Sequence, residues 1–193
     1  MYKQCKTEQS AARQRLMEKG LLELMGIKPF DEITVSDLCE FLQIPRKSFY
    51  RYFSSKEGAF RALLDHTMME YEGFNAVYSD TSCRTLEKEL TQFFLFWMTH
   101  KDLLDALAKN NMSGNLVERT ISQIADGGVI PLRFMNEDML YAQKQVNLFC
   151  VSGLMSIVLT WHKDGYPQSA ENMATITARL VTQPLFPNIQ YHM

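Results

Sequence analysis

Basic side chains gather in one stretch of the sequence that contains no acid. Between Ile44 and Lys56 the chain has four lysines and arginines and no aspartate or glutamate. The whole chain is close to neutral, with 20 basic and 22 acidic residues, so this stretch is a local cationic feature. Such a feature is typical of a site for a polyanion, and from charge alone a solvated surface fits equally well.

Residues suited to catalysis or metal binding are not grouped in the sequence. The four histidines lie 30 or more residues apart, and no nucleophile elbow, phosphate loop, dinucleotide fingerprint or zinc-protease motif occurs. The four cysteines (Cys5, Cys39, Cys83 and Cys150) have no paired spacing, which is typical of reduced thiols in a cytoplasmic protein. The sequence therefore predicts no enzyme activity, no cofactor and no metal.

One uncharged run is long enough to raise the question of a membrane. Gln145–His162 has 18 residues, but it contains amide, hydroxyl and imidazole side chains that lipid disfavours. The N-terminal segment is polar and lacks the apolar core of a signal peptide. We expect a cytoplasmic protein without a membrane span, in which this run is a helix buried on all sides in a core or subunit interface.

Apolar residues recur with the helical period along almost the whole chain, which predicts an all-α fold of about nine helices and no strand. A polar break at Ser79–Arg84 separates two predicted domains. Residues 1–60 form the first domain, the helix at 57–77 connects, and residues 80–193 form the second. The predicted helices are Glu8–Gly26, Thr34–Phe41, Pro45–Phe53, Glu57–Val77, Leu86–His100, Leu103–Asn110, Leu116–Asn136, Glu137–His162 and Glu171–Val181.

Two short helices separated by a tight turn are predicted within residues 33–60. Thr34 and Asp37 have the spacing of a helix cap, and Pro45 both ends the preceding turn and suits the first turn of a new helix. This is the geometry of a helix-turn-helix, whose second helix enters a major groove of DNA. Ser54 and Glu57 have the spacing of a second cap, which would open the next helix.

The second short helix has two different faces. Phe49 and Phe53 are four residues apart and are expected to pack inward. Arginine can bind guanine in a bidentate manner, and lysine and tyrosine can reach bases or phosphates. The side chains expected on this outer face are Arg46, Lys47, Tyr50 and Arg51.

Residues 8–60 resemble the DNA-binding domain of the TetR family of bacterial transcriptional regulators. The family pattern is an aromatic-containing turn, T-V-x-x-[IL]-A, a G-V turn and [TS]-[LF]-Y-x-[YH]-F-x-[SN]-K-E. The matching residues are Phe30, Thr34, Val35, Leu38, Ile44, Ser48, Phe49, Tyr50, Tyr52, Phe53, Ser55, Lys56 and Glu57. The resemblance implies a three-helix DNA-binding domain followed by a helical domain for ligand binding and dimerisation.

Four positions depart from the family pattern. Cys39 replaces alanine, Gln43 replaces the turn glycine, Pro45 replaces serine and Lys47 replaces a common glycine. If the turn requires a positive φ at Gln43, a side chain there costs about 1–2 kcal/mol. These departures would alter the operator or mark a member that no longer binds DNA.

The resemblance and the side-chain chemistry together predict the DNA contacts. Hydroxyl and lysine side chains are expected to bind phosphates. The side chains on the outer face of the second helix are expected to contact bases or nearby phosphates. Phosphate contacts are predicted for Thr34, Ser36, Tyr52 and Lys56. The full predicted DNA-binding set is Thr34, Ser36, Arg46, Lys47, Ser48, Tyr50, Tyr52 and Lys56.

In the second domain, small residues recur on one face of the uncharged run, where another helix can approach closely. The family resemblance implies that the last two long helices pair with those of a second copy. A homodimer interface is therefore predicted, with ordinary packing within one chain as the alternative. The predicted interface residues are Ser152, Gly153, Ser156, Thr160, Met173, Ile176 and Leu180.

Aromatic and methionine side chains are frequent in this domain and suit an adaptable apolar pocket, although they suit a plain core equally well. We expect a small, mostly apolar effector of unknown identity. The predicted ligand-binding residues are Phe93, Trp97, Met98, Met112, Phe134 and Trp161.

The sequence as a whole predicts a ligand-responsive repressor that binds a palindromic DNA operator as a homodimer. Two alternatives stay open. One is a TetR-like regulatory subunit that acts through a protein partner without binding DNA. The other is a helical small-molecule carrier or enzyme, against which the absence of a catalytic set argues.

Overall fold

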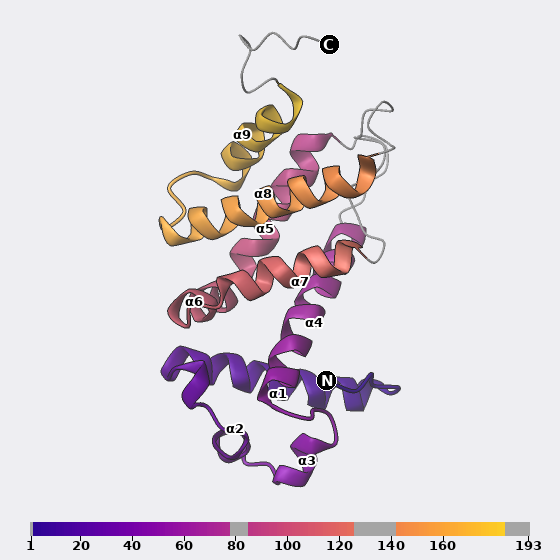
Figure 1. Ribbon diagram of the computed structural model, residues 1–193, viewed down its shortest axis with the longest axis vertical. Helices are drawn as coiled ribbons and strands as arrows, with labels where there is room; N and C mark the ends of the chain where they lie inside the picture. Colours follow the sequence, from indigo (N-terminus) through magenta and orange to yellow (C-terminus); the bar gives the residue numbers. More distant parts are fainter. Residues whose placement is uncertain (1, 78–84, 126–141, 184–193) are drawn as a thin grey trace. The chain divides into compact units, whose positions relative to one another are not determined.

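The computed structural model describes residues 2–77, 85–125 and 142–183 (Figure 1). Nine α-helices and one 3-10 turn form the regular structure of these residues, which confirms the predicted all-α fold. The β-type pairing within them is a single isolated bridge between Tyr2 and Phe53. The elements are α1 (Glu8–Ile27), η1 (Phe30–Glu32), α2 (Val35–Phe41), α3 (Arg46–Tyr50), α4 (Lys56–Val77), α5 (Leu86–Thr99), α6 (Lys101–Lys109), α7 (Ser113–Ala125), α8 (Gln143–Lys163) and α9 (Ala170–Thr182).

Helix ends differ from the sequence prediction at several places. α3 ends at Tyr50 rather than Phe53, because the chain continues there as a turn in which the Tyr52 N–H donates to the Phe49 carbonyl. α7 begins at Ser113, before the predicted Leu116. The predicted helical residues 126–136 and 137–141 lie outside the described residues.

The chain divides into two compact units. The first contains residues 1–73 and 100–119, and the second contains residues 74–99 and 120–193. α6 and the start of α7 therefore pack with the N-terminal helices, although they are far from them in sequence. The division into domains at 1–60 and 80–193 stays a prediction.

Helix α1 is the central element of the first unit, because it packs against both α2 and α6. Its N-terminus is capped by Thr7, whose hydroxyl accepts a hydrogen bond from the Ser10 N–H. Gly20 lies where the end of α2 approaches. A Cβ at this position would be 2.7 Å from a methyl carbon of Leu42, so the absence of a side chain permits the contact.

The end of α6 is hydrogen-bonded to the end of α1 and to η1. The Asn110 side chain accepts from the Phe30 N–H at 2.6 Å and donates to the Met25 carbonyl at 3.1 Å. The ammonium of Lys109 also donates to the Gly26 carbonyl. These bonds satisfy carbonyl groups at a helix end, which have no partner within the helix itself.

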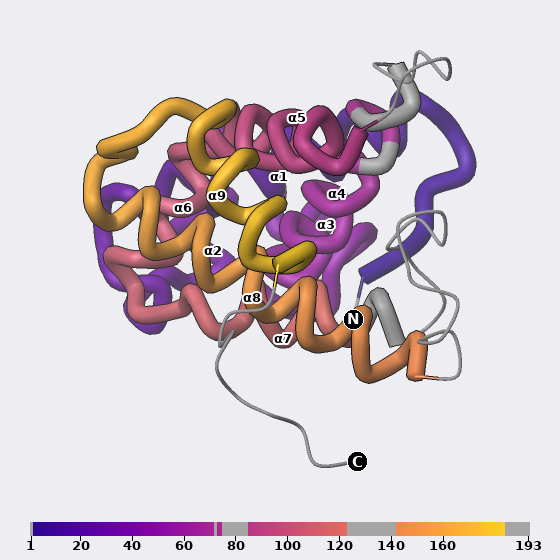
Figure 2. Tube along the Cα trace, turned by 90° about the horizontal axis from the view of Figure 1, so that it is seen from above, coloured from indigo at the N-terminus to yellow at the C-terminus, as the bar shows by residue number. Residues whose placement is uncertain are grey.

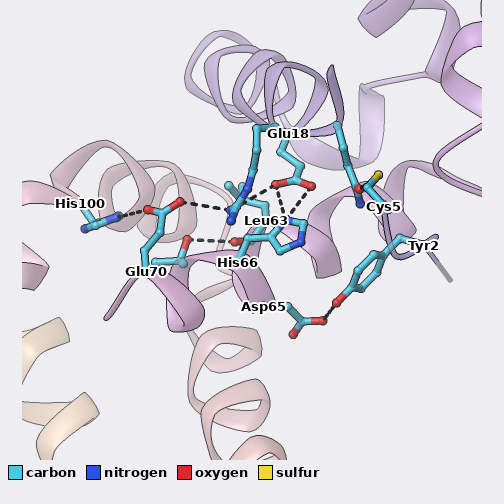
Figure 3. A network of polar contacts seen from close by, with 11 residues as sticks. Tyr2, Cys5, Glu18, Leu63, Asp65, His66, Glu70 and His100 are labelled. Atoms are coloured by element: carbon cyan, nitrogen blue, oxygen red, sulfur yellow. Dashed lines mark hydrogen bonds and ion pairs between the residues drawn. The ribbon is translucent and has the colours of Figure 1, made fainter. Parts of the chain in front are cut away.

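A second polar network joins α1, α4 and the residue before α6 (Figure 3). Nδ1 of His66 lies 2.9 Å from both carboxylate oxygens of Glu18, which is buried. Arg15 pairs with Glu70 at 3.1 Å, and His100 lies 3.3 Å from the same carboxylate. The hydrogen bond with His100 is the main cause that lowers the pKa of Glu70. The first unit is thus held together by charges as well as by its apolar core.

In the second unit α5 packs along α9 (Figure 2). The core is aromatic: Phe93 and Trp97 are buried on α5, and Phe94 contacts Trp161 of α8 edge to face with ring centroids 5.3 Å apart. The indole N–H of Trp161 donates to the Gln168 carbonyl, which fixes the loop between α8 and α9.

The expected burial of the uncharged run on all sides is wrong for the single chain. Met155, Val158 and Trp161 are buried on one side of α8, but Phe149 is 73% exposed and Gly153 has open space around it. By length and composition, α8 is the one helix among the described residues that could cross a membrane.

Candidate nucleic-acid interface

Helix α2 begins with the predicted cap. The Thr34 hydroxyl accepts from the Asp37 N–H at 3.1 Å, and the Asp37 carboxylate accepts from the Thr34 N–H at 2.7 Å. Lys28 donates to the same carboxylate at 2.7 Å. This bond from Lys28, followed by those from Thr34, lowers the pKa of Asp37 to about 2. The cap therefore stays ionised at any ordinary pH and fixes the start of the helix-turn-helix.

The turn between α2 and α3 has a left-handed residue at Gln43, with φ of 52°. The Gln43 N–H donates to the Glu40 carbonyl at 3.0 Å and the Ile44 N–H to the Cys39 carbonyl at 2.9 Å. This pair of bonds is the Schellman arrangement in which glycine usually occupies the left-handed position. Gln43 thus adopts the conformation of the glycine that it replaces, and Pro45 follows as the N-cap of α3.

Replacing Gln43 with glycine is expected to stabilise the protein by about 1 kcal/mol, because it removes the steric cost of a side chain at positive φ. Chemical denaturation monitored by circular dichroism measures this change. Gln43→Ala is the matched control and is expected to give no such gain, since alanine keeps the Cβ. Equal stability of the glycine and alanine variants would show that the turn is not strained.

Helix α3 has the two faces that the sequence predicts. Phe49 is 0% exposed and Phe53 is 1% exposed, and their rings contact each other. On the other face Tyr50 is 51% exposed. The outward residues of α3 and its C-cap are Arg46, Lys47, Tyr50 and Arg51, all exposed, with Ser48 half-buried.

Two predicted phosphate-binding residues are engaged within the protein. Tyr52 is buried, and its hydroxyl lies 3.4 Å from that of Ser10 in α1. The Lys56 ammonium donates to the Phe30 and Asp31 carbonyls at 2.7 and 3.0 Å and lies over the Phe30 ring. The structure thus groups Thr34, Ser36 and the outward residues of α3 as exposed side chains, and it does not place Tyr52 with them.

The cap of α4 differs from the prediction by one residue. The helix begins at Lys56, and the Ser55 hydroxyl accepts from the Gly58 N–H at 3.2 Å. Hydrogen bonding to Ser55 is also the main cause that lowers the pKa of Glu57. The Ser54–Glu57 spacing predicts a helix that begins at Ser55 with Ser54 as its cap. The observed helix begins one residue later, so the capping hydroxyl is that of Ser55.

The predicted effector residues do not all fall in one unit. Phe93, Trp97 and Trp161 are buried in the second unit, where Met98 is 41% exposed. Met112 belongs to the first unit, and Phe134 lies outside the described residues. Sequence reasoning did not single out Asn147 and Thr177, whose side-chain oxygens are buried in the second unit without a hydrogen-bond partner in the described part of the chain.

The predicted dimer residues lie on α8 and α9, where much of their surface is exposed in the single chain. Ile176 is 44% and Leu180 is 43% exposed, whereas Met173 is buried. Phe149 and Val181 add exposed apolar surface that the sequence prediction omitted. The small residues of α8 are Ser152, which is half-buried, and Gly153, Ser156 and Thr160, which are exposed.

This geometry defines a helix-turn-helix fold with a second helical unit. Residues 19–63 match the model of the family described as bacterial regulatory proteins, tetR family. The N-terminal part of the chain is therefore similar to the tetR family of regulatory proteins. The match spans α2, the turn and α3, and it includes the exposed basic residues Arg46, Lys47 and Arg51 of α3 and its C-cap.

Two solved structures are similar to the chain. One is the dihydroxyacetone kinase operon activator DhaS, at 16% identity and a TM-score of 0.51, over 87% of this chain and 93% of that chain. The other is a transcriptional regulator of the TetR/AcrR family from Thermobifida fusca YX-ER1, at 15% identity and a TM-score of 0.48, over 89% of this chain and 97% of that chain. At such identity the first of these supports the fold. No curated protein sequence matches the chain.

Proposed function

We propose that the chain is a cytoplasmic, homodimeric repressor that binds a palindromic DNA operator through α2 and α3. The observation that carries the proposal is the division of α3, where fully buried Phe49 anchors the helix and Arg46, Lys47 and Tyr50 face outward. A short helix fixed in this way presents rigid cationic and hydroxyl groups to a major groove. Arg46 and Lys47 would read bases, and Thr34 and Ser36 would bind phosphates.

Lys56 has a place in this proposal despite its contacts with η1. An ammonium has three N–H donors, and two are directed to the Phe30 and Asp31 carbonyls. One further acceptor can therefore be bound, and a DNA phosphate is the acceptor that we propose. The formed turn at Gln43 and Pro45 argues against the alternative in which these residues mark the loss of DNA binding.

The second unit would provide dimerisation and effector binding. The exposed apolar residues of α8 and α9, Phe149, Ile176 and Leu180 among them, are suited to cover the same helices of a second copy. The aromatic core around Trp97 and Trp161 is suited to a small, mostly apolar effector. The buried oxygens of Asn147 and Thr177 would favour an effector that also carries a hydrogen-bond donor.

The test is selection of DNA from a random-sequence pool by the full chain, followed by anisotropy titrations with selected and scrambled duplexes. Arg46→Ala and Lys47→Ala are each expected to cost about 1–3 kcal/mol on the selected duplex and to relax preference at one base pair. Lys101→Ala, which alters an exposed lysine on α6 in the same unit, is the control and should leave affinity unchanged.

Sedimentation of the complex should give two chains on one palindromic duplex. If no sequence is enriched from the pool, the DNA-binding proposal is contradicted, and the alternative of a regulatory subunit that acts through a protein partner is favoured. Whether the protein represses or activates is determined by measuring transcription, with and without the protein, from a template that carries the selected site upstream of a promoter.

A further inference from the structure

The segment before α1 is held against the end of the helix-turn-helix. Tyr2 and Phe53 form the antiparallel bridge, and the Lys3 N–H donates to the Tyr52 carbonyl at 2.9 Å. Residues 2–7, here called the arm, are therefore paired at Tyr2 and Lys3 with the backbone that leaves α3. Lys3 thus pairs with Tyr52, the residue that directly follows Arg51, the C-cap of α3.

Side-chain bonds fix the arm at two further points. The Tyr2 hydroxyl donates to the Asp65 carboxylate at 2.7 Å (Figure 3). Burial, together with Asp65, raises the pKa of Tyr2 to about 12, so this hydroxyl remains a donor. The Cys5 thiol donates to the buried Gln14 amide oxygen at 2.8 Å. The arm is thus anchored through Tyr2 and Cys5, whereas Lys3, Gln4 and Lys6 are exposed.

The arm extends the cationic surface of the helix-turn-helix. Residues 2–7 contain two lysines and no acid, and residues 44–56 contain four basic residues and no acid. The hydrogen bond between Lys3 and Tyr52, which are 49 positions apart in sequence, joins these two acid-free segments. Lysine is a compact charge that suits phosphate rather than base recognition, and an arm that is already ordered loses little further entropy on binding.

We propose that the arm is a second DNA-binding element, in which Lys3 and Lys6 bind backbone phosphates that flank the groove entered by α3. This inference rests on the proposed function and adds a partner contact to it. Each phosphate contact releases condensed counterions, so two lysines contribute to the salt dependence of binding. Their contribution is independent of base sequence.

The experiment compares the full-length wild type with Lys3→Ala/Lys6→Ala in titrations against selected and scrambled duplexes over a salt series. The slope of log affinity against log salt is expected to become shallower by about 1.8, which is roughly 0.9 for each phosphate. Affinity should fall by a similar factor on both duplexes. Lys101→Ala is the control and is expected to keep the wild-type slope.

The outcomes separate this inference from the proposed function. A wild type that binds no DNA contradicts the proposed function itself. A wild type that binds, together with an unchanged slope in the double variant, contradicts the arm alone. If the double variant instead lost only its preference for one base pair beside the site, the arm would read bases, and the assignment to phosphates would be wrong.

A second variant tests the anchoring of the arm while both lysines are kept. Tyr2→Phe retains the ring and removes the hydroxyl that binds Asp65, so the arm becomes less ordered before it binds. Affinity on both duplexes is expected to fall by about fivefold, the equivalent of one hydrogen bond. The same affinity as wild type, in a variant whose circular dichroism is unchanged, would show that order in the arm does not contribute to binding.

Discussion

Replacing Phe49 with alanine is expected to lower the free energy of unfolding by about 3–5 kcal/mol, the usual cost of removing a buried aromatic ring. Phe49 is 0% exposed, and its ring contacts those of Tyr50 and Phe53. The five-residue helix α3 has no other fully buried side chain to hold it in place. Urea denaturation monitored by circular dichroism measures the loss, and DNA affinity should fall with it.

Tyr50→Ala is the matched control on the same helix, because its side chain is 51% exposed. It should leave stability within about 0.5 kcal/mol of wild type, as exposed positions usually do. On DNA it should still weaken binding, since Tyr50 lies on the outward face. If the urea midpoint of unfolding of Phe49→Ala equals that of the wild type, Phe49 is not the anchor of α3.

The second large effect is expected at Asp65, whose side chain is 4% exposed. The Arg119 guanidinium binds both carboxylate oxygens, one of them at 2.8 Å, and Tyr2 donates a further hydrogen bond. Breaking a buried pair usually costs 3–5 kcal/mol. The Arg119 side chain is 31% exposed and can reach water once its partner is removed. Asp65→Ala is therefore expected to lower the free energy of unfolding by about 3 kcal/mol, the low end of this range.

A double-mutant cycle isolates the pair. Asp65→Ala, Arg119→Met and the double variant are compared by urea denaturation, and the double variant should be more stable than the sum of the two losses predicts. Strict additivity would mean that the two side chains contribute independently, and the network between α4 and α7 would then be incidental to stability.

Local sequence signals predict the helix-turn-helix well. The Thr34–Asp37 cap, the left-handed turn at Gln43 and the start of α3 after Pro45 each depend on a few adjacent residues, so their pattern is visible in the sequence. The end of α3 was less predictable. Phe49 and Phe53 keep the helical spacing although the chain between them leaves the helix after Tyr50.

Contacts between distant residues explain what the sequence could not predict. Lys56 binds carbonyls 25 and 26 residues away, and Asn110 bonds to residues 80 and 85 positions earlier. No local pattern reveals such partners, because they depend on how the helices pack. For the same reason the place of α6 beside α1 was not foreseen, and the effector and dimer residues stay predictions.

The contact between Gly20 and Leu42 has a consequence for how this sequence can change over evolutionary time. A Cβ at position 20 would be 2.7 Å from a methyl carbon of Leu42, so the two positions share one small volume. Their substitutions are therefore expected to be coupled: an alanine at 20 requires the Leu42 side chain to shift, and it is accommodated more easily once that side chain is shortened. Among related chains, small residues at one of these positions should accompany large residues at the other.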